Sequence, residues 1–336
     1  MIKMENKPNK KKMEEALLLL ERRGKKAFDF AKKVILQKKN LCEPVREALN
    51  YFMGKFWYDI QHPALLSLSC EAVNGDPDIT IPIGAATVLL AGAADIHDDI
   101  IDKSEIKNSK LTIYGKFGKE IAILTGDALL FEGLMLLYQE SEKLPQRQGK
   151  RIINLMENAF IEIGNAETEE IKFRRRYNVQ PEEYYDIIKM KAAVAEACAQ
   201  IGAILGGGNL REIKTLGRYG RVLGILMTIR DEFVDIYELD ELENRVKNEC
   251  LPLPILYAFK DNSLKKRLIL LLNKPKLTEE DVYKIIELVM NSKEIKELKK
   301  HMKSLIRNTL NEIIFFAHRP VFNELRLLLL STIEDL

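Results

Sequence analysis

Hydrophobic residues recur three and four positions apart along almost the whole chain, which is the spacing of an amphipathic α-helix. No convincing run of alternating hydrophobic and polar positions marks a half-buried strand. Glycine and proline residues separate several of the helical runs. Helices are predicted at residues 11–37, 43–60, 63–73, from 82 past 98, 115–138, 148–177, 181–206, 210–239, 255–260, 263–273 and 278–291, then to about 318, and finally 320–334.

The helical pattern continues without a fixed-period repeat, a low-complexity linker or a break in composition. We therefore expect one all-α domain over residues 1–336, built as a single large bundle of long helices. The chain is 46% hydrophobic, which is enough to bury a large core.

The net charge of +2 favours neither nucleic-acid binding nor attraction to a membrane surface. The four cysteines lie far apart with no CxxC pair, which favours reduced thiols over a zinc site. The N-terminus lacks the apolar core of a signal peptide. The uncharged run over 79–94 is shorter than the ~20 residues that span a bilayer. We expect a cytoplasmic protein with no nucleic-acid partner and no stable membrane insertion.

The uncharged run leads to an acidic motif, Asp98-Asp99-Ile100-Ile101-Asp102. Asp98 and Asp102 are four residues apart, so they project from one face of a helix. Burial strengthens the repulsion between their carboxylates, and a hard divalent cation with oxygen ligands would relieve it. Taken alone, however, such a motif is more typical of a helix cap or a solvated face.

A second acidic cluster lies within another apolar helical run. Asp231, Glu232 and Asp235 occupy positions i, i+1 and i+4 of this run. Two such clusters on separate buried helices would be costly as purely structural features. If they face each other across a bundle, they form a site for several metal ions.

Several motifs together resemble the trans-isoprenyl diphosphate synthase (polyprenyl synthetase) family of the class I isoprenoid synthase superfamily. The resemblance extends over roughly 63–258 and implies an isoprenoid synthase-like bundle with a central apolar cavity. It also implies a homodimer. The motifs are IHDDIIDKS at 96–104, Thr112, Phe117-Gly118, AILTGDALL at 122–130, the stretch 184–191 and the second acidic run at 224–235.

The resemblance implies an enzyme that ionises an allylic prenyl diphosphate with Mg²⁺, three ions when substrate is bound. Mg²⁺ and basic side chains would absorb the charge that develops on the departing pyrophosphate. The implied catalytic residues are the first-choice metal ligands Asp98, Asp102 and Asp231, together with Lys191 at the diphosphate. Further metal ligands or their partners would be Asp99, Glu232 and Asp235, and further substrate contacts would come from Lys107, Arg230, Lys247 and Thr228.

Two alanines suggest room for a long prenyl chain. Ala93 and Ala94 lie about one helical turn before Asp98, where the family forms the floor of its chain-binding cavity. Bulky aromatics at this place stop chain growth in the family. We expect a substrate or product of ~20 carbons or longer, unless the deeper Leu90 or Phe131 closes the cavity.

The segment before Pro63 departs from the family. Family members carry GGKRLR before this proline, and its Lys and Arg hold isopentenyl diphosphate, whereas residues 57–62 here read WYDIQH. After the first acidic motif, the family's two arginines are replaced by Lys107 and Asn108. Losing several charge-assisted contacts would weaken binding of isopentenyl diphosphate by orders of magnitude.

Three functions therefore remain open. The first, which the resemblance favours, is a prenyltransferase that couples the carbocation to isopentenyl diphosphate or to another acceptor. The second is a terpene synthase-like enzyme that acts on a single prenyl diphosphate without elongation. The third is a non-catalytic regulatory subunit of a prenyl synthase, which would have no physical need for two acidic clusters.

Two basic features near the motifs have simpler interpretations. His97 points about 100° away from its neighbour Asp98 on a helix, so a hydrogen-bonded core histidine is favoured over a metal ligand. The triplet Arg174-Arg175-Arg176 is interpreted as a solvated surface rather than as the mouth of a site.

Overall fold

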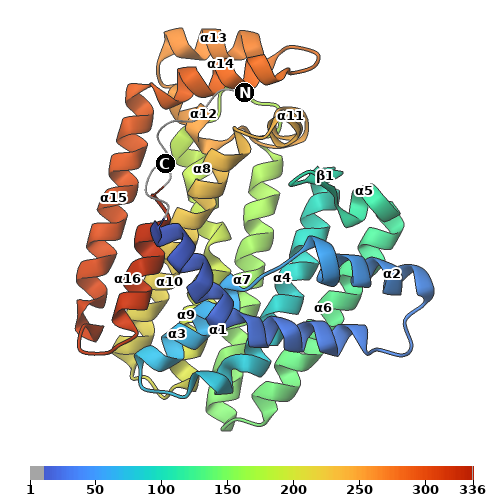
Figure 1. Ribbon diagram of the computed structural model, residues 1–336, viewed down its shortest axis with the longest axis vertical. Helices are drawn as coiled ribbons and strands as arrows, with labels where there is room; N and C mark the ends of the chain where they lie inside the picture. The colour runs from blue at the N-terminus through green and yellow to red at the C-terminus, as the bar shows by residue number, and fades with distance from the viewer. Residues whose placement is uncertain (1–10, 335) are drawn as a thin grey trace.

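The computed structural model describes residues 11–334 and residue 336, and it confirms the all-α prediction (Figure 1). The strands within this part of the chain are β1 (Ile106–Lys107) and β2 (Lys110–Leu111), which form one short antiparallel hairpin. The helices are α1 (Lys11–Leu36), α2 (Glu43–Tyr51), η1 (Phe52–Phe56), α3 (Gln61–Ala72), η2 (Pro77–Thr80), α4 (Ile81–Ile101), α5 (Ile113–Phe117), α6 (Lys119–Glu142), α7 (Gln146–Ile171), α8 (Pro181–Lys191), α9 (Ala193–Leu205), α10 (Leu210–Asp235), α11 (Leu239–Asn248), α12 (Leu253–Ala258), α13 (Asn262–Leu272), α14 (Glu279–Met290), α15 (Lys293–Ile313), η3 (Ile314–Phe316) and α16 (Phe322–Ser331).

Four predicted helices are interrupted in the structure, and one of them, predicted over 115–138, is divided at Gly118 into α5 and α6. The helix predicted over 43–60 ends as α2 at Tyr51, and the backbone is extended at Trp57 after the π-helical turn η1. The helix predicted over 181–206 is divided at Ala192 into α8 and α9. The helix predicted over 210–239 ends at Asp235, and α11 begins at Leu239. No glycine or proline marks the breaks at Ala192 and between Asp235 and Leu239, so the periodicity alone could not reveal them.

The centre of the bundle is α9, which packs against α3 on one side and α10 on the other. Most residues of α3 and α9 are buried. Small residues allow these helices to approach closely: a Cβ added at Gly202 would clash with the Leu66 carbonyl oxygen, and one at Gly220 would lie 2.5 Å from the Ala195 carbonyl oxygen. This close packing fixes the positions of α3 and α10 relative to α9.

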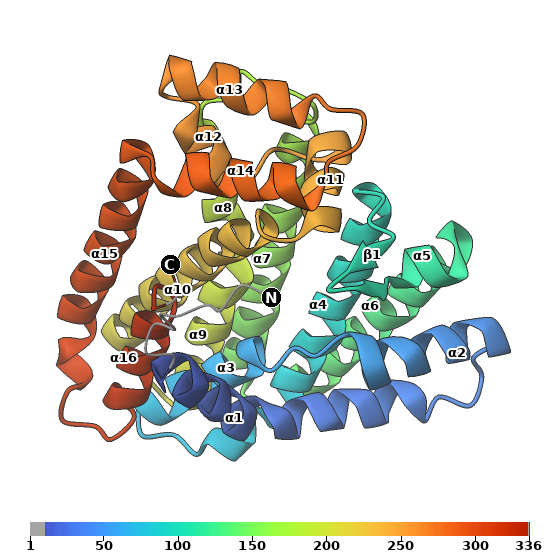
Figure 2. The ribbon, with the colours of Figure 1, turned by 45° about the horizontal axis from the view of Figure 1, so that its top comes forward.

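Both ribbon views show where the remaining helices lie around this centre (Figures 1 and 2). Helices α11 to α14 lie across one end of the bundle, α15 and α16 run along one side, and α2 and α5 lie on the other. Helix α4 packs along α6, with its C-terminus directed toward the end of the bundle that α11 covers. The first acidic motif therefore lies at the end of the bundle that α11 covers.

Within the described residues, two helical segments are long and apolar enough to cross a membrane by length and composition alone. They are residues 77–101 and 119–142, and the apolar window of the first is 67% buried, whereas that of the second is 39% buried. The first segment is therefore a core helix of the bundle. The second retains an exposed apolar face.

The packing at Gly202 generates a stability prediction. We expect Gly202→Ala to lower the free energy of unfolding by about 1–3 kcal/mol, because the new methyl group would push α9 away from the Leu66 carbonyl. Gly164→Ala is the matched control, since a Cβ there meets no atom within 4 Å and alanine favours the helix by ~0.5–1 kcal/mol. Urea unfolding followed by circular dichroism measures both. Equal stability of the two variants would contradict the close approach.

Candidate active site

Three carboxylates meet where α4 ends beside α7. Asp98 lies in the last turn of α4, Asp102 caps the helix, and Glu167 comes from α7. Each offers an oxygen within 4.8 Å of the others, and this is the group of potential metal ligands found in the described part of the chain. Donors on one hard divalent ion lie ~2.0–2.6 Å from it, so oxygens at this spacing need only small side-chain movements to share one ion.

Lys191, the last residue of α8, supplies positive charge to this group. Its Nζ lies 3.0 Å from Glu167 and 2.5 Å from Glu170. Burial by itself would lower the pKa of Lys191, but the charges of Glu170, Glu167 and Asp98 raise it well above its ordinary value. Lys191 is therefore a firmly protonated cation beside the carboxylates, where the sequence predicts a diphosphate contact.

One lysine does not satisfy all of these acids. Burial and the charge of Asp98 raise the pKa of Asp102 to about 8, and burial with the charges of Asp98 and Glu170 raises that of Glu167 to about 7 despite Lys191. Buried Asp98 Oδ1 has no hydrogen-bond partner. An all-oxygen donor set with this excess of negative charge fits a hard divalent cation.

The neighbouring aspartate of the first motif is engaged differently. Asp99 is fully buried, and its Oδ1 lies 2.6 Å from Nζ of Lys107, the second residue of β1. The same Nζ is 3.5 Å from Asp95. Lys107 is thus paired with Asp95 and Asp99 of α4. Asp99 therefore lies outside the Asp98–Asp102–Glu167 group.

The second acidic cluster surrounds an arginine. Glu232 accepts hydrogen bonds from Arg245 of α11, from the Tyr184 hydroxyl at 2.8 Å and from the Leu253 amide at 2.8 Å. Asp235 lies 3.5 Å from Arg245 Nε. The Arg245 guanidinium is therefore a cation between the buried acids on α10, and metal binding by the second cluster stays a prediction.

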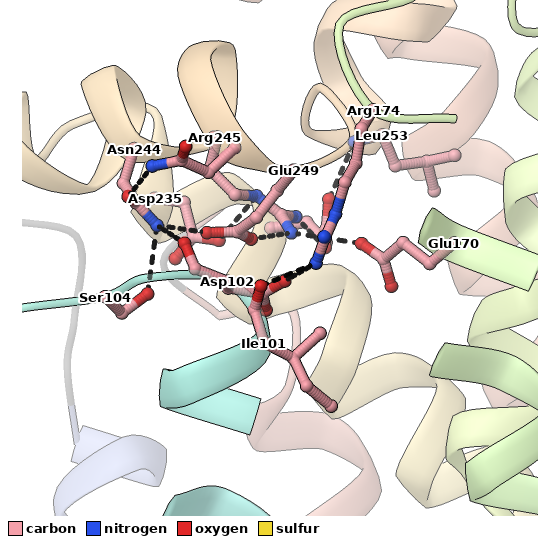
Figure 3. Close-up of polar contacts among 12 residues, drawn as sticks. Ile101, Asp102, Ser104, Glu170, Arg174, Asp235, Asn244, Arg245, Glu249 and Leu253 are labelled. Atoms are coloured by element: carbon pink, nitrogen blue, oxygen red, sulfur yellow. Dashed lines mark hydrogen bonds and ion pairs between the residues drawn. The ribbon is translucent and has the colours of Figure 1, made fainter. Parts of the chain in front are cut away.

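Arg245 joins the two halves of the site. Its guanidinium also contacts Glu170 at 3.5 Å and Glu249 at 2.9 Å (Figure 3). Glu170 in turn binds Lys191, so a continuous chain of charges runs from α11 to the Asp98–Asp102–Glu167 group. Sequence reasoning found neither Glu167 nor Arg245, and no local pattern in the sequence distinguishes them from surface charges.

A cavity of about 290 Å³ lies beside Lys191, between α1, α3, α9, α10 and α16. Of the predicted site residues, it is lined by Lys191, Thr228, Arg230 and Asp231. The Asp231 side chain is 71% exposed and lies 3.9 Å from Arg230. His62 also lines this cavity, and its Nδ1 lies 2.8 Å from Asp59.

Three predicted site residues lie elsewhere. Ala93 is buried and Ala94 half-buried on α4, and neither lines the cavity beside Lys191. Lys247 is exposed at the end of α11, where its Nζ binds Glu243 at 2.9 Å. The sequence could not show this position of Lys247, because α11 was not among the predicted helices.

The structure agrees with the interpretation of His97 but not with that of the whole arginine triplet. His97 lies with Nε2 3.4 Å from Asp127, away from the carboxylate group, which agrees with a satisfied histidine. The interpretation of the arginine triplet as mere solvated surface is wrong for Arg174, which donates to Asp102 Oδ1 at 2.7 Å and to the Ile101 carbonyl at 2.9 Å (Figure 3). Packing of the α7–α8 connection against the end of α4 brings them together, which the sequence could not show.

The sequence is similar to those of several isoprenyl diphosphate synthases. A short chain isoprenyl diphosphate synthase from Methanothermobacter thermautotrophicus is 32% identical over 180 residues, which is 53% of this chain and 54% of the relative. A geranylgeranyl diphosphate synthase from Sulfolobus acidocaldarius is 29% identical over 69% of this chain and 67% of its own. This chain thus spans about half the length of the first relative.

The fold has close counterparts among solved structures. A geranylgeranyl pyrophosphate synthetase from Pyrococcus horikoshii superimposes with a TM-score of 0.81 at 24% identity, covering 96% of this chain and 99% of that one. At this identity the likeness establishes the fold. The sequence model of the polyprenyl synthetases matches residues 45–289, which is most of the chain. The protein is therefore a member of the polyprenyl synthetase family.

Proposed function

We propose that the protein is a Mg²⁺-dependent prenyltransferase that ionises an allylic prenyl diphosphate and releases pyrophosphate. The observation that carries this proposal is the Asp98–Asp102–Glu167 carboxylate group with Lys191 beside it. Family membership and the relatives named as isoprenyl and geranylgeranyl diphosphate synthases support the same reaction.

Each part of the site has a distinct task in this reaction. Asp98, Asp102 and Glu167 would hold Mg²⁺, which bound there supplies positive charge to the leaving pyrophosphate. The protonated Lys191 would bind the diphosphate and add a second, fixed source of charge. The resemblance implies three ions, and exposed Asp231 is the residue of the second cluster that remains open to one.

The segment before Pro63, where family members hold isopentenyl diphosphate, carries less positive charge here than in the family. Asp59 caps α3 by accepting from the Gln61 amide at 3.0 Å and the His62 amide at 3.3 Å, and it also pairs with the His62 ring. Burial lowers the pKa of His62, but the charge of Asp59 raises it above its ordinary value. The pair is therefore close to neutral overall, and it replaces two family cations.

We propose prenyl transfer to isopentenyl diphosphate or to another acceptor as the reaction of this site. The Asp59–His62 pair favours one second candidate, a terpene synthase-like reaction in which a single prenyl diphosphate is ionised without elongation. A purely regulatory role is less well supported, because Asp98, Asp102 and Glu167 would repel one another without any compensating use.

The prenyl chain would extend along α4 from the carboxylate group. Phe131 is 70% exposed on α6, so it does not close a path inside the bundle. Leu90 is buried, and a Cβ added at Gly133 of α6 would lie 2.8 Å from its side chain. We propose that Leu90 forms the end of the chain-binding space and that Ala93 and Ala94 leave it open as far as that residue.

A homodimer is the assembly that we propose. Helix α6 exposes a set of large apolar side chains that a second copy could cover, in line with the family resemblance. They are Ile123, Leu124, Phe131, Leu134, Met135 and Tyr138.

Removing one carboxylate of the proposed metal group tests the ionisation step. We expect Asp98→Asn and Glu167→Gln each to lower the rate of Mg²⁺-dependent pyrophosphate release by about 10²-fold or more, because a metal-held charge is lost where the leaving group develops its own. Glu169→Gln is the matched control, since Glu169 is exposed on the same helix and pairs with Lys172. Unchanged turnover in Glu167→Gln would remove this residue from the site.

Product analysis separates the candidate functions. We expect purified protein with Mg²⁺ and labelled farnesyl or geranylgeranyl diphosphate to make longer diphosphates only when isopentenyl diphosphate or another acceptor is added. Chromatography of the extracted products, before and after phosphatase treatment, gives the answer. A hydrocarbon or alcohol formed from the single substrate would support the second candidate instead, and no turnover with either mixture would contradict both.

The exposed face of α6 generates a prediction on assembly. We expect the wild-type protein to sediment as a dimer and Phe131→Glu to shift it to a monomer, because a charge on this face must be desolvated in the interface. Leu270→Glu is the control, since Leu270 is 74% exposed on α13, at a different surface. A dimer that persists in Phe131→Glu but dissociates in Leu270→Glu would place the interface elsewhere.

A further inference from the structure

Arg174 is a cation beside the Asp98–Asp102–Glu167 group, and the proposed reaction assigns no role to it. It lies in the connection between α7 and α8 and reaches the C-terminal end of α4 (Figure 3). There its guanidinium donates to Asp102 Oδ1 at 2.7 Å and to the Ile101 carbonyl at 2.9 Å. Its Nε is buried and has no hydrogen-bond partner, so one donor remains to be used.

The backbone around Arg174 is anchored by its neighbour. Arg175 has a φ of 57°, its amide donates to the Glu249 carbonyl at 3.4 Å, and its Nε donates to the Lys247 carbonyl at 2.5 Å. Arg175 and Arg176 are both exposed, whereas Arg174 is half-buried. The connection is therefore held against α11 in a way that directs one arginine of the triplet toward Asp102.

Arg174 differs from the other arginine of the site in how firmly it is held. Arg245 has a side chain that is only 6% exposed, and it contacts four carboxylates, which come from α7, α10 and the residue that follows α11. The side chain of Arg174 is 26% exposed and contacts one carboxylate, that of Asp102. Arg245 is thus a fixed part of the packing, whereas Arg174 can exchange its carboxylate for another anion at low cost.

A guanidinium and a divalent cation on one carboxylate repel each other. Asp102 is a member of the three-carboxylate group and is also the ion-pair partner of Arg174. Ligands on one Mg²⁺ lie at most about 4 Å apart, since each is ~2.1 Å from the ion. A diphosphate oxygen on the same ion as Asp102 therefore lies within reach of a guanidinium that already touches Asp102.

We propose that Arg174 is a diphosphate-binding residue that competes with metal ions for Asp102. Metal binding at Asp102 displaces the guanidinium from the carboxylate, and the guanidinium then donates its hydrogen bonds to the diphosphate that shares the metal. Planar, bidentate donation of this kind suits a phosphate group. The inference rests on the proposed function, because it assigns Arg174 to the substrate of that same site.

The proposal predicts effects of opposite sign on two ligands. In Arg174→Gln, Mn²⁺ alone should bind about 3- to 10-fold more tightly than in the wild type, because a competing positive charge is removed. Inorganic pyrophosphate in excess Mg²⁺ should bind about tenfold or more weakly, because a charge-assisted contact is lost. Electron paramagnetic resonance measures free Mn²⁺, and calorimetry measures pyrophosphate. Arg176→Gln is the matched control and should change neither affinity.

A fixed structural salt bridge gives a different result. If Arg174 only fastens the α7–α8 connection to α4, Arg174→Gln should bind Mn²⁺ equally or more weakly, and this outcome overturns the proposal. Tighter Mn²⁺ binding with unchanged pyrophosphate affinity also overturns it, because the diphosphate contact would then be absent. If Arg174→Gln does not fold, Arg174→Lys replaces it, with the same signs and smaller changes expected.

The two binding measurements are independent of turnover. A wild-type protein that transfers no prenyl group but shows both shifts in Arg174→Gln would contradict the proposed function and retain the inference. A wild type that is active while the variant shows neither shift would do the reverse. In the active case, we also expect the KM for the allylic diphosphate to rise in Arg174→Gln and to remain unchanged in Arg176→Gln.

Discussion

Repulsion among carboxylates at the covered end of the bundle is the constraint on which the site depends. Helices α4, α7, α10 and α11 all direct acids to this place, and each buried acid needs a cation within contact distance. Lys107 compensates Asp99, and Arg245 compensates Glu232. The Asp98–Asp102–Glu167 group, with Lys191 and Arg174 as its cations, still has more negative than positive charge and offers three oxygens to a metal ion.

The same pairing fixes the helices that cover the site. Arg245 lies on α11 and is buried among acids of α7 and α10, so α11 is tied to the bundle through its charge rather than through apolar contacts alone. The Glu232 carboxylate also accepts from the Leu253 amide at the start of α12. Part of the second acidic cluster therefore has a structural role, which is to hold α11 and α12 against the bundle, whereas Asp231 is exposed and lines the cavity beside Lys191.

How far the sequence could predict this site depends on the range of each contact. Asp98 and Asp102 could be assigned together because the geometry of one helix places residues i and i+4 on the same face. Glu167 and Arg174 join them only through the packing of α7 and its following connection against α4, which no local pattern encodes. The all-α fold followed from periodicity, whereas the break at Ala192 did not, because no glycine or proline marks it.

The proposed reaction depends on the position of the metal ion, and diffraction can locate that ion directly. Crystals soaked with Mn²⁺ and pyrophosphate, measured at a wavelength where manganese scatters anomalously, should show a peak bounded by Asp98, Asp102 and Glu167. The pyrophosphate should lie on the side of Lys191. Anomalous density confined to Asp231 and Asp235, with none between Asp98 and Glu167, would contradict the account.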